Sequence, residues 1–433
     1  MPHTHETSTV GVAERHENSN ASNLNSSNRP ADLPGPGKSE PTAVCIVVEN
    51  LSVPGDRRVL CEALALRDAG YFVSVICPKG KKTATSSYEV FDGIHIYRHR
   101  SFEASSAAGY LMEYGLSLLA ELYLILKVFS RRRFSILQGC NPPDTIFLLG
   151  LLLKPFGVKF IFDHHDLSPE LLDVKFGQKI KLISKLVRFA EKCSFRVADV
   201  SIATNESFKQ VAVARGGKSP EKVFVVRNCP DLATMRRGPA QPDLKRGKPL
   251  LVVYVGMMAE QDGIDLLIES IEHLVKQEKR NDTHFALVGG GTMLPTLRSL
   301  VAEKGLDEFV TFTGRVPHEE VVSFLSNADL GVAPDPKTPM NDRSTMIKIF
   351  EYMALSLPIV QFDLTEGRNI AGPAALYASP NDPVDFARQM TCLLDSPDLR
   401  QKLGAAGRKR IEDSLNWENE KLTLLQAYRS ALQ

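Results

Sequence analysis

The stretch Leu250-Leu-Val-Val-Tyr-Val-Gly256 decides the fold, because it starts a second series of strands and helices in a chain of 433 residues. Its uninterrupted apolar run is typical of a buried strand in a parallel sheet. Helical periodicity follows at Ile264–Leu274 and Leu294–Glu303. Further strands of this series are expected at His284–Val288, Val310–Phe312, Leu330–Ala333 and Ile359–Phe362. Strands that alternate with helices predict a parallel sheet with helices on both faces.

An earlier series alternates in the same way and begins with the apolar run Ala43–Val48. Its other strands are expected at Tyr71–Cys77, Ile94–Tyr97, Ile136–Gln138, Lys159–Phe162, Val200–Ala203 and Val223–Val226. Between the two series, Asn228–Lys248 contains three prolines and two glycines, which is typical of a linker. We predict an α/β fold of two doubly wound, Rossmann-like parallel sheets that face each other across a ligand-binding cleft.

These patterns divide the chain into five segments. We predict a disordered tail over residues 1–41, an N-terminal domain over 42–228, a linker over 229–248, a C-terminal domain over 249–413, and a final helix over 414–433 that packs back on the N-terminal domain. The tail is rich in Ser, Asn, His and Pro and lacks the cationic start and apolar run of a signal peptide.

Composition and cysteine usage indicate a cytoplasmic protein. The formal net charge is +1, so no global field predicts a nucleic-acid partner. The seven cysteines are odd in number and form no CxxC pair, which favours reduced thiols over disulfides or structural zinc. The most apolar stretches, Leu111–Ser130 and Thr145–Phe162, are interrupted by charged residues, so neither is expected to span a membrane.

The stretch Asn341-Asp-Arg-Ser-Thr-Met-Ile-Lys-Ile-Phe-Glu-Tyr-Met-Ala354 predicts a helix over Thr345–Leu355 that is apolar on most of its circumference and therefore buried. A narrow polar stripe remains, made of Ser344, Lys348, Glu351 and Tyr352. Because a buried carboxylate needs partners, we expect Glu351 to accept hydrogen bonds from sugar hydroxyls and Lys348 to meet a phosphate. The alternative is a Lys348–Glu351 pair, three residues apart on a solvated edge.

Two further segments follow expected strands. The glycine-rich turn Gly289-Gly-Gly291 leads into a helix, and such turns bring backbone N–H groups close to anions. The second segment, Asp163-His-His-Asp166, predicts an Asp–His pair that orients a substrate hydroxyl. Metal binding is the alternative for this segment, although no further cluster of His or Cys supports it.

Two loops and one helix complete the candidates. The loop Asn50–Arg58 offers Arg57 or Arg58 to an anion, or these are solvated charges at a helix start. Asn141-Pro-Pro-Asp144 is expected to line the same cleft. The apolar stretch Tyr110–Phe129 runs into a basic cluster, Arg131-Arg-Arg133, which suits an anionic membrane surface, the alternative being a core helix with a basic end.

Taken together, these residues resemble the family-4 retaining glycosyltransferases of the GT-B fold, of the bacterial cell-surface polysaccharide type. The resemblance runs from about Val44 to Asp413. Its most specific part is Lys348-Ile-Phe-Glu-Tyr-Met-Ala354, followed by Pro358-Ile-Val360. Weaker matches are His165-Asp166, Tyr254–Asp265, Gly289–Gly291 and Thr313-Gly-Arg-Val316.

The resemblance implies transfer of a sugar, of hexosyl type, from a nucleotide-sugar donor with retention at the anomeric carbon and without a metal or other cofactor. It implies a donor side in the C-terminal domain and an acceptor side in the N-terminal domain. Donor-binding positions would be Gly256, Gly289, Gly290, Arg315, Val316, Arg343, Ser344, Lys348 and Glu351. Acceptor-side positions would be Gly55, Asp56, Arg57, Asn141 and Asp144. The catalytic positions would be His165, Asp166, Lys348 and Glu351.

Two departures from the family pattern concern charge. Where many members carry an Arg and a Lys that grip the diphosphate, this chain has Met257 and Asp262. Where many members place a second glutamate, eight positions before Glu351, it has Arg343. The cation that stabilises a leaving diphosphate must then come from elsewhere, with Lys348 the first candidate, then Arg343 and Arg315.

The predicted function is therefore sugar transfer to a glycan or lipid-linked acceptor, in the cytoplasm and peripherally on the inner membrane face. The alternatives are a nucleotide-sugar epimerase on the same fold and a non-catalytic sugar-nucleotide binding module. The donor sugar, its base, the acceptor, the linkage and the oligomeric state stay open.

Overall fold

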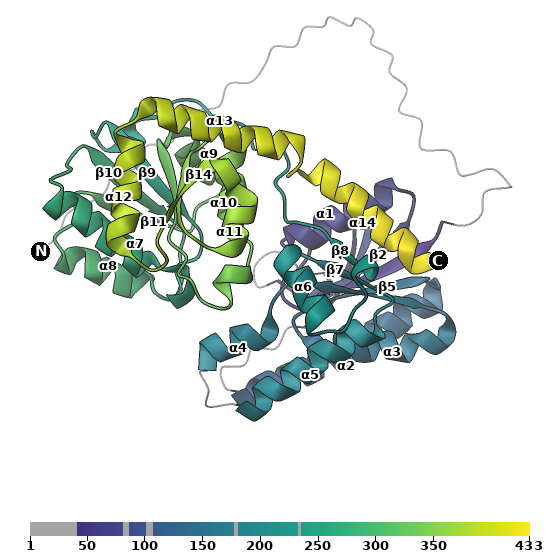
Figure 1. Ribbon diagram of the computed structural model, residues 1–433. Helices are drawn as coiled ribbons and strands as arrows, with labels where there is room; N and C mark the ends of the chain where they lie inside the picture. The colour runs from purple at the N-terminus through teal and green to yellow at the C-terminus, as the bar shows by residue number, and fades with distance from the viewer. Residues whose placement is uncertain (1–40, 81–85, 101–106, 177–180, 233–234) are drawn as a thin grey trace, which may run out of the picture. The chain divides into compact units, whose positions relative to one another are not determined.

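The computed structural model describes residues 41–80, 86–100, 107–176, 181–232 and 235–433, and residues 41–433 belong to one compact unit (Figure 1). The tail predicted over residues 1–41 lies, except for Pro41, outside the described residues. Two sheets are present, each with helices on both faces, and they confirm the predicted fold class.

The first sheet has eight strands in the order β3-β4-β2-β1-β5-β6-β7-β8. Its strands are β1 (Ala43–Val47), β2 (Phe72–Pro78), β3 (Tyr88–Phe91), β4 (Ile94–His99), β5 (Ile136–Cys140), β6 (Lys159–His164), β7 (Val200–Ala203) and β8 (Val223–Val225). All neighbours are parallel except β3 and β4. The helices are α1 (Arg57–Asp68), α2 (Ala107–Arg131), α3 (Phe147–Leu153), α4 (Ser168–Phe176), α5 (Lys181–Val197) and α6 (Glu206–Ala214).

The second sheet has six parallel strands in the order β11-β10-β9-β12-β13-β14. Its strands are β9 (Leu250–Val255), β10 (Thr283–Val288), β11 (Val310–Gly314), β12 (Leu330–Ala333), β13 (Ile359–Phe362) and β14 (Ala375–Ala378). The helices are α7 (Ile264–Glu272), α8 (Leu294–Glu303), α9 (His318–Asn327), α10 (Ile347–Ala354), α11 (Thr365–Ala371), α12 (Pro383–Leu394) and α13 (Pro397–Asp413). The last helix, α14 (Trp417–Leu432), contributes Leu424 and Tyr428 to the core of the first sheet.

The uninterrupted apolar runs reflect sheets that are buried on both faces. Alternate residues of a strand point to opposite faces. In β1, Cys45 enters the core beneath α2, α3 and α5, whereas Ile46 enters the core beneath α1 and α14. In β9, Tyr254 and Val253 divide in the same way. A face exposed to water would instead require polar residues at every second position.

Three expectations about elements need correction. The strands β3 and β14, which both lie at sheet edges, were not expected. The strand β6 continues to His164 because Asp163 and His164 still pair with β7, so both residues lie within the strand. The helix α10 begins at Ile347, so Ser344 precedes the helix.

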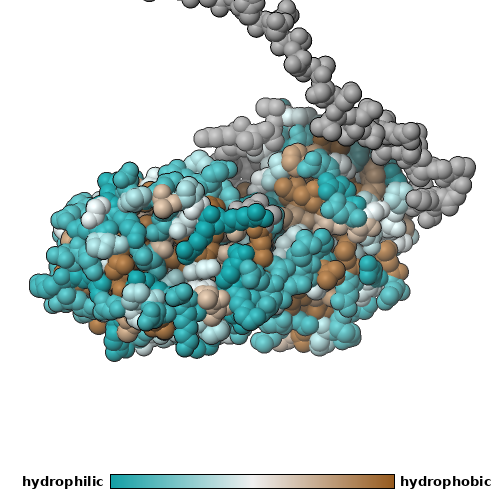
Figure 2. Space-filling view, turned by 90° about the horizontal axis from the view of Figure 1, so that it is seen from above, coloured by the Kyte–Doolittle hydropathy of each residue, from teal (hydrophilic) through white to brown (hydrophobic). Residues whose placement is uncertain are grey.

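None of the helices among the described residues is long and apolar enough to cross a bilayer. Figure 2 shows a face on which hydrophilic residues predominate and hydrophobic residues gather in small groups. Single exposed apolar residues of this kind are ordinary.

Candidate functional site

Glycine turns meet at the carboxyl edge of the second sheet. The N–H of Gly256, after β9, donates to the Val288 carbonyl over 3.1 Å, and the N–H of Gly289, after β10, donates to the Gly314 carbonyl over 3.1 Å. Gly289 has a φ of +137°, and a Cβ there would lie 1.9 Å from the Gly256 oxygen. Only glycine allows this approach, and the edge therefore presents backbone rather than side chains.

Lys348, on α10, is buried and its Nζ donates to both oxygens of Asp335, over 2.7 and 2.9 Å. The ammonium also lies 4.9 Å from the centre of the Tyr254 ring. Burial opposes the charged form of Lys348, but Asp335 outweighs it and raises the lysine pKa. The lysine therefore pairs with Asp335 rather than with Glu351. The sequence contained one signal for Asp335, namely that it is a charged residue two positions after the strand expected at Leu330–Ala333.

Glu351 lies one turn further along α10 and is half-buried. Among the described residues its carboxylate has neither a hydrogen-bond donor nor an ion-pair partner. Burial raises the pKa of Glu351 to about 6. A half-buried carboxylate without an internal partner is suited to accepting hydrogen bonds from a ligand.

The other two residues of the expected polar stripe have structural contacts. Tyr352 is fully buried; its hydroxyl accepts from the Val255 N–H and donates to the Val332 carbonyl, both over 3.0 Å, which ties α10 to β9 and β12. Ser344 donates to the Met340 carbonyl over 2.8 Å within the turn before α10. The stripe was inferred from a helical wheel, and a wheel does not show which polar side chain finds backbone partners.

A cation lies beside the position where the family's arginine is missing. Arg315 follows β11 and is exposed, and its Nη2 lies 3.8 Å from the sulfur of Met257. A Cβ on Gly290 would lie 3.3 Å from the Arg315 Cγ, so the guanidinium stem borders the glycine turn. Among the described residues Arg315 forms no ion pair. The neighbouring Val316 is half-buried.

The other charged candidates of this half are less well placed to face an anion. Asp262 accepts from the Ala259 N–H over 2.9 Å, and burial raises its pKa. Arg343 is exposed in the short turn Asn341–Arg343. The Arg343 guanidinium lies 3.7 Å from the Glu170 carboxylate, which offsets its charge, and the carboxylate of Asp262 would repel an anion.

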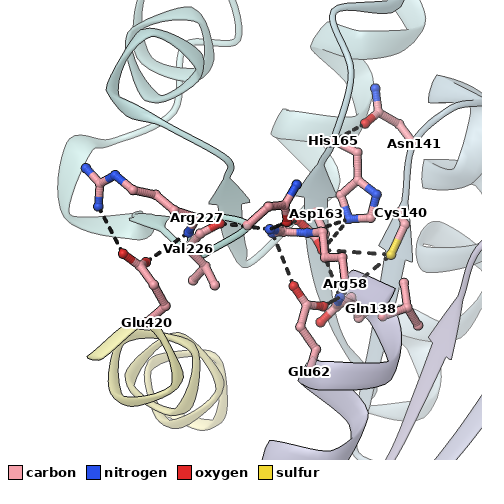
Figure 3. Close-up of polar contacts among 12 residues, drawn as sticks. Arg58, Glu62, Gln138, Cys140, Asn141, Asp163, His165, Val226, Arg227 and Glu420 are labelled. Atoms are coloured by element: carbon pink, nitrogen blue, oxygen red, sulfur yellow. Dashed lines mark hydrogen bonds and ion pairs between the residues drawn. The ribbon is translucent and has the colours of Figure 1, made fainter. Parts of the chain in front are cut away.

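The N-terminal half contains a buried ionic cluster, which Figure 3 shows. Arg58, on α1, lies within 2.9 Å of Asp163 on β6 and within 3.1 Å of Glu62. Its Nη1 donates to the Val226 carbonyl and to the Asn228 side chain, each over 2.8 Å. Arg57, by contrast, is exposed. The structure thus separates two arginines that the sequence left equivalent.

Three residues that were not candidates in the sequence complete this cluster, namely Glu62, Gln138 and Tyr428. Gln138, on β5, donates to Glu62 over 2.7 Å and to Asp163 over 3.0 Å, and its oxygen accepts from the Tyr428 hydroxyl over 2.5 Å. Burial, followed by the nearby Asp163, raises the pKa of Glu62 to about 7. Because Glu62 and Tyr428 are 366 positions apart, no local pattern could show that both contact Gln138.

His165 stands at the edge of this cluster, with 13% of its side chain exposed. Its Nε2 lies 2.7 Å from Asp163 and 3.0 Å from the Arg58 Nε. One ring nitrogen cannot accept from arginine and donate to aspartate simultaneously. Burial lowers the pKa of His165, but Asp163 outweighs burial and raises it, so we assign Nε2 as a donor to Asp163. The Asp–His pair expected from sequence is therefore Asp163 with His165.

The metal alternative for this segment does not fit its surroundings. Cys140, Asp163 and His165 offer ligand atoms within 4.8 Å of one another. However, Arg58 already compensates Asp163, and a second cation would face its guanidinium. Burial also raises the pKa of the Cys140 thiol well above its usual value, which disfavours the thiolate that binds metals.

The remaining acceptor-side candidates divide by burial. Asn141 is buried; it accepts from the N–H groups of His165 and Asp166 and donates to Asp144 over 3.0 Å. Asp144 is also buried, and burial raises its pKa to about 6. Asp56 caps α1 by accepting from the Val59 N–H over 3.1 Å. Of the acceptor-side candidates, Gly55 and Arg57 are exposed to a ligand. Asp166, expected from sequence to be catalytic, is half-buried.

Solved structures with the same architecture cover most of the chain. Sucrose-phosphate synthase from Thermosynechococcus elongatus superposes with a TM-score of 0.73 at 18% identity, over 90% of this chain and 99% of that one. Anabaena HepE, solved in complex with UDP, superposes with a TM-score of 0.62 at 13% identity, over 90% of this chain and 100% of that one. Two doubly wound sheets of this kind define the GT-B glycosyltransferase fold.

Sequence comparison agrees with the fold. The model for "Glycosyltransferase Family 4" matches residues 56–234, and the model for "Glycosyl transferases group 1" matches residues 249–396. The chain belongs to the family-4 glycosyltransferases of the GT-B fold. Its relatives include an alpha-D-kanosaminyltransferase of Streptomyces kanamyceticus, 29% identical over 35% of this chain, and a D-inositol 3-phosphate glycosyltransferase of Thermobifida fusca, 28% identical over 54% of it. The chain spans 38% and 56% of the lengths of these two relatives.

Proposed function

We propose that the protein is a retaining glycosyltransferase that moves a hexosyl group from a nucleotide-sugar donor to a glycan or lipid-linked acceptor, without a metal ion in the transfer step. One observation carries the proposal. The glycine-lined edge of the second sheet is bordered by Lys348 on α10 and by the exposed guanidinium of Arg315, after β11. Glu351, one turn beyond Lys348, forms no ion pair among the described residues. A carboxylate such as Glu351 can accept hydrogen bonds from sugar hydroxyls, and a guanidinium such as Arg315 can donate to a diphosphate.

The nucleotide part of the donor fits the glycine turns. Backbone N–H groups at a strand-to-helix turn bind phosphate because side chains do not block the approach. Here the turn from β10 toward α8 contains Gly289 and Gly290. Two proteins of the same fold, Anabaena HepE and a trehalose-6-phosphate enzyme from E. coli, were solved with UDP and with UDP-2-fluoro glucose, respectively. Uridine nucleotides are therefore the first donors to test.

The proposed transfer forms a bond from an acceptor oxygen to the anomeric carbon, on the face from which the diphosphate departs. The bond from that carbon to the phosphate oxygen breaks, and its electrons go to the diphosphate. The acceptor proton passes to a leaving phosphate oxygen. Arg315 would stabilise the negative charge that develops on the diphosphate. Lys348 is less suited to this role, because Asp335 already compensates its charge.

Glu351 would accept hydrogen bonds from hydroxyls of the donor sugar or the ribose. We expect Glu351→Gln to lower kcat/KM by about 100-fold, the loss typical of one removed polar contact to the reacting group. Glu319→Gln, at an exposed carboxylate on α9, is the matched control and should leave the rate unchanged. The rate is measured as nucleoside diphosphate release together with glycosylated product, after a thermal-shift screen of nucleoside diphosphates has identified the donor base.

The pKa of Glu351 gives this test a second readout. Its folded-state pKa of about 6 lies above the unfolded value, so ionisation of this group costs stability as the pH rises through about 6. At pH 7.5, the free energy of unfolding of Glu351→Gln should therefore be about 1–2 kcal/mol higher than that of the wild type. Wild-type turnover in this variant would refute the donor-binding role. The wild-type rate itself should fall as the pH drops through about 6, because the protonated carboxyl loses acceptor capacity.

Two other functions on the same fold are separated by their products. A nucleotide-sugar epimerase would convert its sugar without any acceptor, whereas a transferase would show at most slow hydrolysis. A non-catalytic binding module would bind the nucleotide and release no diphosphate when acceptor extracts are added. The non-catalytic binding module is kept as an alternative because Met257 and Asp262 stand where many family members have a basic pair.

A lipid-linked acceptor would bring the enzyme to a membrane surface, and we propose a peripheral contact made by α2, α3 and α5. These helices contribute to one core face of the first sheet and lie near one another in Figure 1. Their outer sides expose large apolar residues, namely Leu116, Leu119, Tyr123, Leu126, Leu148, Leu151, Leu152, Leu182, Leu186 and Phe189. Exposed basic residues, Arg131 and Arg133, end the first of them. Apolar and basic residues together suit an anionic bilayer.

A further inference from the structure

Three buried polar side chains converge at the carboxyl edge of the first sheet, away from the cluster around Arg58. Glu49 follows β1, His99 is the last residue of β4, and Glu121 lies on α2. The strands β1, β2 and β4 run parallel, so their carboxyl ends share one edge. The ligand atoms of the three side chains lie within 4.8 Å of one another.

Among the described residues no lysine or arginine pairs with Glu49 or Glu121, so a proton or a bound cation must balance their charge. Glu121 is 1% exposed, and neither of its carboxylate oxygens has a hydrogen-bond partner. The Glu49 Oε2 and His99 Nε2 atoms are also buried without a hydrogen-bond partner, although they lie 3.2 Å apart. Two carboxylates in a buried site require a compensating cation or a proton. Burial, followed by the nearby Glu49, raises the pKa of Glu121 well above its usual range.

The imidazole of His99 is oriented as a metal ligand would be. Its Nδ1 lies 3.0 Å from the backbone carbonyl of Arg100 and therefore carries the hydrogen in that contact. The lone pair of the neutral ring is then on Nε2, which points at Glu49. Metal-binding histidines commonly donate their other N–H to a backbone carbonyl in this way. A cation bound between these two atoms, or a proton on one of them, would join His99 and Glu49 across the 3.2 Å.

We propose that Glu49, His99 and Glu121 bind one divalent cation, Zn²⁺ or Mn²⁺. Bonds of about 2.0–2.2 Å in a tetrahedral site would place ligand atoms roughly 3.4 Å apart, which is close to the 3.2 Å between Glu49 and His99. A ligand atom of Glu121 lies within 4.8 Å of both. An imidazole with two carboxylates suits Zn²⁺ or Mn²⁺, whereas Mg²⁺ and Ca²⁺ prefer oxygen ligands alone. The buried hydroxyl of Ser117, one turn before Glu121, also lacks a partner and lies on the same helix face.

The ion would join α2 to the edge of the sheet. Its charge of +2 balances the two carboxylates, and binding releases the proton that Glu121 otherwise retains. This role is structural and is independent of the donor site in the second sheet. A metal here is compatible with a transfer step that uses none. No local cluster marked this site in the sequence, because the ligands come from positions 49, 99 and 121.

Calorimetric titration of the chelator-treated full chain tests the site with Zn²⁺ as the probe. We expect the wild type to bind one equivalent of Zn²⁺ that Glu121→Gln and His99→Gln bind about 100-fold more weakly. His95→Gln, on the same strand, is the matched control and should retain the equivalent. The histidines at positions 3, 5 and 16 provide weak competing sites, which all four proteins share. Mg²⁺ should produce no comparable heat.

Equal Zn²⁺ binding by the wild type and Glu121→Gln would overturn the proposal. It would also be overturned if Zn²⁺ left the wild-type melting temperature unchanged while Glu121→Gln raised it, because the carboxylates would then share a proton instead. If the variants fail to fold, the wild type alone decides the question. Tetrahedral Co²⁺ absorption that one equivalent of Zn²⁺ abolishes supports the site, and its absence refutes it.

Discussion

Removal of the Asp335 carboxylate should destabilise the protein by about 3–5 kcal/mol, because it leaves the buried Lys348 ammonium without its partner. Asp335 is 1% exposed and Lys348 is 8% exposed, so water cannot replace the lost contact. The two hydrogen bonds, of 2.7 and 2.9 Å, show that the pair is fully formed. The substitution Asp335→Asn keeps the shape of the side chain, removes the charge, and replaces one of the two acceptor oxygens with an NH2 donor.

A double-mutant cycle separates the charge from the packing. Lys348→Met should also be costly, because Asp335 then becomes the unpaired buried ion. The double variant Asp335→Asn/Lys348→Met should recover a large part of the loss, with a coupling energy of about 2–3 kcal/mol. A buried pair replaced by neutral groups of similar volume is often nearly neutral.

Urea denaturation followed by far-ultraviolet circular dichroism measures these free energies. The single tryptophan, Trp417, lies on α14 and packs in the core of the first sheet. Its fluorescence therefore reports on the other sheet and tests whether the loss is confined to the second one. The stabilisation should be constant between about pH 6 and 9 and should fall as the pH rises through the pKa of Lys348, which Asp335 raises. A loss below about 1 kcal/mol for Asp335→Asn would refute the assignment of Asp335 as the compensating charge.

Two further predictions concern function. Arg315→Ala should lower kcat/KM by about 10²–10³-fold in the transfer assay. Met257→Arg in that background should restore part of the rate, because the two side chains lie 3.8 Å apart at the same edge. An unchanged rate in Arg315→Ala would exclude the guanidinium from the diphosphate site. The double variant Leu182→Glu/Phe189→Glu should co-sediment less than the wild type with vesicles that contain anionic lipid. The control Leu422→Glu, at a similarly exposed position on α14, should bind as the wild type does. Equal binding by the wild type and both variants would refute the proposed surface.

The fold was accessible from sequence because it rests on local periodicity. The runs at Ala43–Val48 and Leu250–Val255 are apolar at every position, since both faces of each sheet are covered. Short edge strands lack this signal. The strand β3 alternates exposed and half-buried residues, and the two central residues of β14 are half-buried, so neither was expected.

The candidate site was less accessible, because its contacts join residues far apart in the chain. The sequence singled out Lys348 and Glu351 but not Asp335, which decides which of the two remains unpaired. It treated Arg57 and Arg58 alike, although one is exposed and the other forms the centre of a buried ionic cluster. It placed Asn141 and Asp144 at the ligand surface, whereas both are buried beneath the loop that carries His165.

By itself, the sequence determined two doubly wound sheets and the helix that carries Lys348 and Glu351, because hydrophobic periodicity depends on neighbouring residues alone. The tertiary structure decided the charge state around them. Whether a buried ion is compensated depends on which side chains the topology brings within about 3 Å, and a linear pattern does not contain that distance. The pairing of Lys348 with Asp335, the exposure of Arg315 beside Met257, and the convergence of Glu49, His99 and Glu121 were visible only in three dimensions.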